Sequence, residues 1–218
     1  AYIAHTINDK QQSIWLAQRE GRAKDANDRT QESLLKMLNM SGNADVATNL
    51  ATLNICPLSI SYEYDPCDYL KAREFQLKRD NPDYKKQPQD DLISMQTGVM
   101  GYKGKVVYTM TGDINNELQA IASEGLAKSE VFGRVAELID SRIHANYNIF
   151  TINKIAYDLL AGNNRFEKEY TVMEKLDFER YLEKQLLKIE LDKKDDNFLM
   201  KKMLEMYSNP LINYLQTL

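Results

Sequence analysis

The amino-acid sequence predicts an α/β domain over residues 1–114, followed by an all-helical extension over residues 115–218. In the first half, short apolar runs typical of strands alternate with segments that carry apolar residues at helical spacing, which is the pattern of an α/β layer structure. From about Asn115 onward glycines become rare, and apolar residues recur three or four positions apart. That spacing predicts helices throughout the second half.

The chain opens with a helix end and a short apolar run. Residues 1–12 carry isoleucines at helical spacing and are predicted to end an amphipathic helix. Residues 13–18, "SIWLAQ", are apolar and bounded by charge, which predicts a buried strand. A charged loop follows this run.

Two helices are predicted next. "TQESLLKMLNM", residues 30–40, predicts a helix with Thr30 as its N-cap and Glu32 in its first turn. Residues 44–53 continue as a second helix, with apolar residues on one face.

Two further strands complete the predicted α/β part. The stretch "NICPLSISYEYDP", residues 54–66, alternates and is rich in β-branched and aromatic residues, so it predicts a strand with Pro57 at its start. "GYKGKVVYTMTGDI", residues 101–114, predicts a third strand. Residues 68–91 between them carry both charge signs and two prolines, and are expected to form a helical turn and an exposed loop.

The last segment, "NFLMKKMLEMYSNPLINYLQTL", is rich in methionine and leucine and contains the adjacent Lys201 and Lys202. Two interpretations stay open: a helix on a membrane surface, or a helix packed on the domain or on a partner. The second is preferred, because only these two basic residues flank the apolar positions.

Composition excludes several classes of protein. The chain is 43% hydrophobic and 28% charged, as in ordinary globular proteins, and its net charge of −4 argues against a general nucleic-acid binder. No apolar run is long enough to span a bilayer as a helix, and no signal peptide is visible. The two cysteines, Cys56 and Cys67, lack metal-ligand spacing and are expected to be reduced thiols in a reducing compartment.

The sequence contains no complete catalytic set. His5 and His144 are its only histidines, and neither lies in a nucleophile motif or a zinc motif. His144 is expected to be a helix-surface or packing residue. Walker-type and GxGxxG phosphate loops are absent from the sequence.

The charged turn "REGRAKD", residues 19–25, is the candidate binding site. Arg22 and Lys24 lie two positions apart and can direct two cations at one anion, for which phosphate is the usual choice. The alternative is a solvated turn in which these cations pair with neighbouring acids such as Glu20 and Asp25. The pattern alone does not decide between the two.

The order of two motifs adds a resemblance. "WLAQREGRAKD" followed by "NLATLNICPLSISYEYDP" resembles the third and fourth sequence blocks of the glycerolipid acyltransferases, in particular the glycerol-3-phosphate and dihydroxyacetone-phosphate O-acyltransferases. In that family the third block is a strand that ends in Glu-Gly-Thr-Arg-Ser-Arg or Glu-Gly-Gly-Arg-Ser-Arg. The fourth block is an apolar strand that opens on proline, as "PLSISYEY" opens on Pro57 here. "IHANYNIFTINKIAYDLLAG" is similar to the helical tail of the same branch, so that the resemblance covers about half of the chain.

The third block fits this chain in two registers. Matching Glu20 and Gly21 to Glu-Gly leaves Ala23 where the family has arginine. Matching Arg22 and Lys24 to Arg-Ser-Arg keeps the cation pair but places Arg19 where the family has glutamate. The second register is preferred, and Arg22 ahead of Lys24 is then implied to bind the acceptor's phosphate, with Glu20 and Gly21 beside them and Pro57 in the pocket wall.

The family's first block, a histidine and an aspartate separated by four residues, is not in this chain. His5 and Asp9 have only three residues between them. The chain also begins without methionine, and is therefore expected to be the carboxyl-terminal portion of a longer protein: the later part of a mixed-sheet acyltransferase-like domain and a helical extension.

The resemblance implies an enzyme of phospholipid synthesis. A histidine outside this chain would take a proton from a hydroxyl of glycerol 3-phosphate or a lysophospholipid, whose oxygen would attack the thioester of acyl-CoA or an acyl carrier protein. These carriers are co-substrates, and no other cofactor, metal or nucleic acid is expected. The protein would be cytoplasmic and peripheral on the inner face of the cytoplasmic membrane. The alternative is a non-catalytic, acyltransferase-like module that binds lipid or another protein.

Overall fold

The protein is mostly helical, at 59% of its residues, and contains a small two-stranded antiparallel sheet. Its structure is a computed structural model that describes residues 2–19, 23–40, 42 and 44–218. The elements in chain order are α1 (Tyr2–Ala4), the π-helical η1 (His5–Asp9), α2 (Glu32–Asn39), α3 (Val46–Ala51), β1 (Leu58–Tyr62), α4 (Asp68–Asp80), α5 (Pro88–Met100), β2 (Val106–Met110), α6 (Asn115–Ser123), α7 (Lys128–Ala145), α8 (Thr151–Ala161), the 3-10 helix η2 (Glu167–Glu169), α9 (Val172–Leu187) and α10 (Asp196–Leu215).

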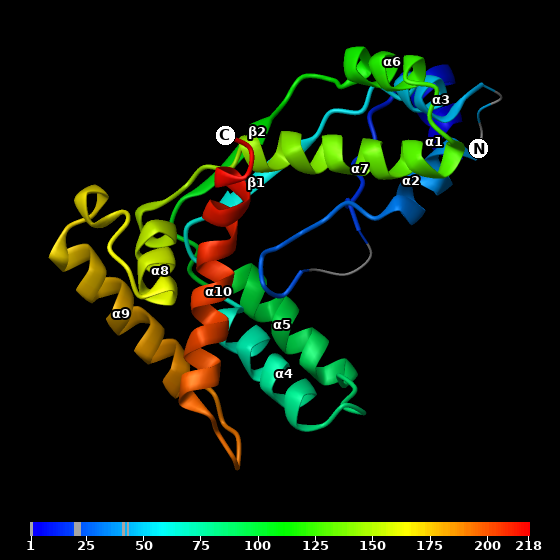
Figure 1. Cartoon of the computed structure of the whole chain (residues 1–218). Helices are drawn as coiled ribbons and strands as arrows, with labels where there is room; N and C mark the ends of the chain where they lie inside the picture. The colour runs from blue at the N-terminus through cyan, green and yellow to red at the C-terminus, as the bar shows by residue number, and fades with distance from the viewer. Residues whose placement is uncertain (1, 20–22, 41, 43) are drawn as a thin grey trace.

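The molecule has two arms that meet at the sheet (Figure 1). We call the first the α7 arm, which contains α1–α3, α6 and α7, and the second the α10 arm, which contains α4, α5, α8, α9 and α10. Each arm has its own hydrophobic cluster. Amphipathic helices of this kind are stable only when their apolar stripes cover one another, and the two clusters supply that cover.

The cluster of the α7 arm is built from α2, α3, α6 and α7. Leu35, Leu50 and Leu118 are fully buried in it. Val135 of α7 is buried in the same cluster. The predicted helices at residues 30–40 and 44–53 are confirmed, because their apolar positions share the face that packs here.

The cluster of the α10 arm surrounds α10, which packs against α8, α4 and α9. Leu199, Met203 and Met206 of α10 are buried there. The last segment of the chain is therefore a packed helix, which confirms the preferred interpretation. No helix in the described residues is long and apolar enough to cross a membrane.

Strands β1 and β2 pair antiparallel, with Ile60 opposite Tyr108. The predictions of strands around residues 54–66 and 101–114 are confirmed. In a sheet with one covered side, apolar side chains usually face the interior and polar side chains face solvent. Here the arrangement is reversed, because Ser59 and Ser61 are buried, whereas Tyr108 and Met110 are exposed.

The predicted strand at residues 13–18 is wrong. These residues form no regular structure, and Trp15 is exposed. A strand requires a neighbour that accepts and donates its backbone hydrogen bonds, and among the described residues β1 and β2 pair only with each other. The mixed sheet expected from the resemblance is accordingly limited here to two strands.

The expectation of a turn and an exposed loop at residues 68–91 is also wrong. Residues 68–80 form α4, and α5 begins at Pro88. The mixed charges belong to the helix surface, where Glu74 pairs with Lys78 one turn later. The prolines mark helix ends, since Pro82 follows α4 and Pro88 occupies the first turn of α5.

Both hydrophobic clusters draw residues from either side of position 114. Ile114 itself is fully buried in the cluster of the α7 arm, and Ala72 lies in that of the α10 arm. The division into residues 1–114 and 115–218 stays a prediction.

Candidate functional site

The segment 23–30 connects the two arms. Figure 1 shows it running from the side of α5 up to α7, just before α2 begins. The α10 arm holds it through two hydrogen bonds: the Asp25 carbonyl accepts one from Asn209 of α10 at 2.7 Å, and Arg29 donates one to Asn213 of α10 at 3.2 Å. The α7 arm holds its other end through Asp140. The segment that carries the predicted site is thus fixed between separate helices.

Asp140 of α7 anchors the end of this segment. Its carboxylate accepts hydrogen bonds from the backbone N–H of Thr30 at 2.8 Å and from the Thr30 hydroxyl at 2.6 Å. Gln18 also donates to it, at 3.3 Å. Thr30 was expected to cap α2, but its hydroxyl bonds to Asp140. Gln31 occupies the N-cap position, and its side chain does not cap the helix.

Lys24 extends from the segment to α4. Its ammonium forms an ion pair with Glu74, whose side chain is nearly buried. The same carboxylate also accepts Lys78, at 3.1 Å. One carboxylate cannot neutralise two ammonium groups, so this cluster, which we call the Lys24 cluster, carries an excess of one positive charge.

Charged side chains at the start of α5 also affect the protonation of Lys24. Lys86 and Asp91, which pair at 2.6 Å, both act on Lys24. The pKa of Lys24 is lowered to about 8, mainly by burial and in addition by the neighbouring Lys78 ammonium. A partly buried, incompletely neutralised ammonium of this kind would bind a phosphate or a carboxylate favourably.

We expect Lys24 to lose its proton at a pH near 8, more than two pH units below an ordinary lysine. The measurement is an NMR titration of the lysine side chains, with Lys24→Gln to assign the signal. Lys78→Gln should raise the pKa of Lys24 because it removes a positive neighbour, whereas Lys175→Gln on α9 should leave it unchanged. If Lys24 instead titrated near pH 10.5, its ammonium would not be buried beside Lys78 as described.

The structure describes two of the five predicted site residues. Glu20, Gly21 and Arg22 lie outside the described residues. Lys24 lies in the cluster on α4. Pro57 is buried immediately before β1, where its carbonyl accepts hydrogen bonds from the N–H and the hydroxyl of Thr111. The contacts of Lys24 and of Pro57 therefore belong to different elements, α4 and the end of β2.

Sequence reasoning missed Glu74, Lys78 and Lys86, because residues 68–91 were expected to be mainly loop. The available signal was the spacing of Glu74 and Lys78, four positions apart, which favours a helix with paired charges.

The two histidines differ in environment. His5 and Asp9, in η1, form a hydrogen bond of 2.6 Å on an exposed surface, although their spacing differs from the family's histidine block. His144 is buried, and its Nε2 lies 3.4 Å from the Asp28 carbonyl. Burial lowers the pKa of His144, as expected for a packing residue.

A second buried polar cluster lies in the α10 arm. The Asp68 carboxylate accepts hydrogen bonds from the hydroxyls of Tyr181 on α9 and Tyr207 on α10, both at 2.8 Å, and from the N–H of Tyr69 at 2.6 Å. Gln185 donates to the Tyr181 hydroxyl at 2.6 Å. Burial raises the pKa of Asp68 to about 6, although the two tyrosine hydroxyls act in the opposite direction. This cluster joins α4, α9 and α10.

Two pockets that are open to solvent lie on other parts of the surface. One, of about 370 Å³, is lined by residues around Glu167 and Val172 near the start of α9, and the other, of about 420 Å³, lies between α2 and α7. In the described part of the chain, no group of three or more His, Cys, Asp or Glu side chains could hold a metal ion.

Comparisons with protein-family models, with curated proteins and with solved structures found no match to this chain.

Proposed function

We propose that the protein takes part in the transfer of a fatty acyl group from a thioester carrier to glycerol 3-phosphate or a lysophospholipid, and that this chain supplies the side of the site that holds the acceptor's phosphate. The observation that carries the proposal is the excess positive charge of the Lys24 cluster. Lys24 lies two positions after Arg22 in the sequence. The resemblance of "REGRAKD" and "PLSISYEYDP" to two family blocks, in the family's order, supports it.

The chemistry divides between this chain and a histidine that the resemblance places upstream. That histidine would remove the proton from the acceptor hydroxyl, the oxygen would attack the thioester carbonyl, and the carrier thiol would leave with a proton. Arg22 and Lys24 would hold the phosphate and thereby orient the hydroxyl. Pro57, which is buried immediately before β1, would shape the pocket wall without contacting the reacting atoms.

We further propose that the protein works in the cytoplasm, peripherally on the inner face of the cytoplasmic membrane, where a phospholipid precursor would be used. The thioester donor, acyl-CoA or acyl carrier protein, would be its soluble co-substrate.

In the full-length protein, Arg22→Ala is expected to raise KM for glycerol 3-phosphate much more than KM for the acyl donor. The loss of a charge-assisted phosphate contact costs about 1.5–3 kcal/mol, which corresponds to a factor of roughly 10–150. Steady-state kinetics of acyl transfer measure both constants.

Arg180→Ala is the matched control for Arg22→Ala, because Arg180 lies exposed on α9 and pairs only with the nearby Asp177 at 3.2 Å among the contacts described here. An unchanged acceptor KM in Arg22→Ala would mean that another cation binds the phosphate, or that the other register of the block applies.

A binding module without catalysis is the second candidate. The observation that favours it is the apolar surface left uncovered on the sheet, where Tyr108 and Met110 are exposed. A histidine and an aspartate separated by four residues upstream, together with thioester consumption in the presence of acceptor, would support the enzyme. Acceptor or lipid binding without any thioester consumption would support the module.

A further inference from the structure

Helix α5 is inverted relative to an ordinary amphipathic helix. None of its residues is buried. Its small and polar side faces α4: the Ser94 carbonyl accepts a hydrogen bond from the Cys67 thiol at 3.3 Å, and a Cβ at Gly98 would lie 3.6 Å from the same sulfur. Asp90 pairs with Arg73 of α4 at 3.8 Å.

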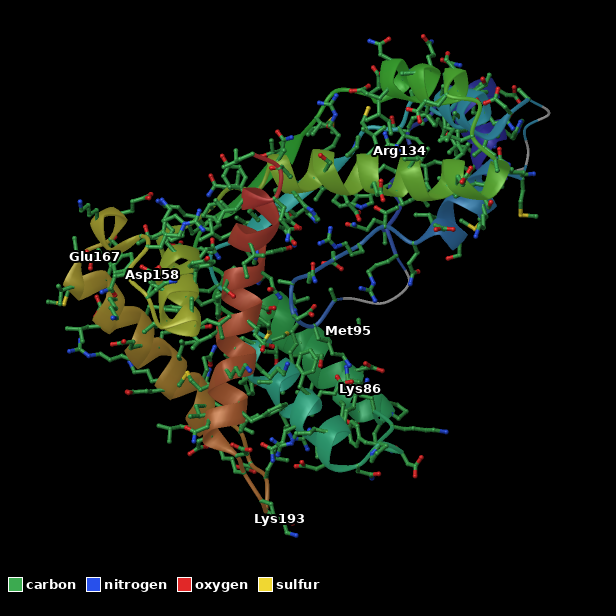
Figure 2. All side chains as sticks on the ribbon, viewed as in Figure 1. Lys86, Met95, Arg134, Asp158, Glu167 and Lys193 are labelled. Atoms are coloured by element: carbon green, nitrogen blue, oxygen red, sulfur yellow. The ribbon has the colours of Figure 1, made fainter. Side chains whose placement is uncertain are left out.

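The opposite side of α5 is apolar and exposed. At 3.6 residues per turn, its large apolar residues fall within an arc of about 160°, which also contains Gln89 and Gln96. We call this surface the α5 face, and its members are Leu92, Ile93, Met95, Val99 and Met100. Figure 2 labels Met95 beside this helix. A surface helix that turns its apolar side outward needs a cover that the described chain does not supply.

Tyrosine and lysine residues flank both ends of α5. Tyr84, Lys85 and Lys86 precede the helix, and Tyr102, Lys103 and Lys105 follow it. Residues 84–105 contain four lysines and two aspartates, and counting Asp83 just outside leaves the region positive, although the whole chain is negative. Both aspartates are engaged, Asp90 with Arg73 and Asp91 with Lys86.

We propose that the α5 face docks on an anionic lipid surface, with α5 lying parallel to the membrane plane. An interfacial helix requires an apolar stripe, amphipathic aromatic rings at its ends and cations that reach lipid phosphates, and α5 has all three. The proposal rests on the peripheral membrane association proposed above and assigns that association to α5, since α10 is committed to the core of its arm.

Charge favours lipid over a second copy of this chain as the occupant. In a two-fold pairing of α5 with itself, the lysines at the ends of one helix would approach those of the other, and like charges would oppose the contact. An anionic membrane meets the same lysines with opposite charge.

The test is sedimentation of the full chain with vesicles of phosphatidylglycerol and phosphatidylcholine at equal molar parts, and with phosphatidylcholine alone. We expect binding to the anionic vesicles, weakened by salt. The triple variant Leu92→Ser/Met95→Ser/Val99→Ser should lose roughly tenfold or more in apparent vesicle affinity, because three exposed side chains no longer enter the lipid.

The matched control is Val172→Ser/Met173→Ser/Leu176→Ser, which removes three exposed apolar side chains from α9 and should leave vesicle binding unchanged. Circular dichroism and thermal unfolding of both variants check that the fold is retained, which their exposure predicts.

A depth measurement adds a second readout. In a Trp15→Phe background, which removes the single tryptophan, Met95→Trp should be quenched by brominated lipids, and Met173→Trp should not. Quenching at position 95 alone would support docking through α5.

Three results would overturn the proposal. They are equal vesicle binding by the α5 and α9 triple variants, no binding to anionic vesicles at all, and a concentration-dependent dimer that the α5 variant abolishes. Acyl transfer to glycerol 3-phosphate without vesicles is measured separately, so that its success or failure tests the proposed activity independently of α5.

Discussion

Phe178→Ala is expected to lower the free energy of unfolding by about 3–5 kcal/mol. Phe178 on α9 is 1% exposed and lies at the centre of the α10 arm. Its ring packs edge-on against Tyr207 of α10, at 5.2 Å between ring centroids, and parallel to Tyr181. Truncation would leave a cavity between two helices, and the rigid rings around it cannot collapse to fill it.

Denaturant unfolding monitored by circular dichroism measures this effect. Leu187→Ala at the end of the same helix is the control: Leu187 is 79% exposed, so its truncation should change stability by no more than about 0.5 kcal/mol. Equal effects of the two substitutions would show that α9 does not pack on α10 as described.

The pH dependence of stability is expected to report Asp68. Its pKa is about 6 in the folded protein, above the ordinary 3.8. A raised folded pKa means that the folded state binds the proton more tightly, so the contribution is fully present below about pH 4 and is lost as pH rises through about 6. A shift of about two pKa units corresponds to roughly 3 kcal/mol.

The Asp68→Asn variant isolates this contribution. Other carboxyls act in the opposite direction: Arg79 lowers the pKa of Asp80, and the pKa of Asp195 is lowered by the Phe198 N–H and by Arg79, so both favour the folded state at higher pH. The free energy of unfolding of the wild type minus that of Asp68→Asn should therefore be larger at pH 4 than at pH 7.5, by about 2.5 kcal/mol.

Asp177→Asn is the control for Asp68→Asn, because the Asp177 carboxyl is exposed on α9. The difference between the wild type and this control should vary little between the same pH values. A wild-type minus Asp68→Asn difference that does not change with pH would contradict a buried, titrating Asp68.

Local patterns determined much of the secondary structure. The spacing of apolar residues predicted the helices of the second half, and alternation with Pro57 at its start predicted β1. These predictions succeeded because a helical stripe or a strand with an available partner has few competing arrangements.

Long-range pairing decided the rest. The run at residues 13–18 has strand-like composition, but no described strand pairs with it. Residues 68–80 have loop-like composition, but α4 packs on α10 and contributes Ala72 to its cluster.

The candidate site divides in the same way. The sequence by itself identified the charged turn and proposed Arg22 and Lys24 as its cations. Only the tertiary structure brought Lys24 to Glu74, fifty residues away, and lowered the pKa of its ammonium by burial beside Lys78. Ion pairs and burial join residues that are distant in the chain, and a one-dimensional pattern does not contain those distances.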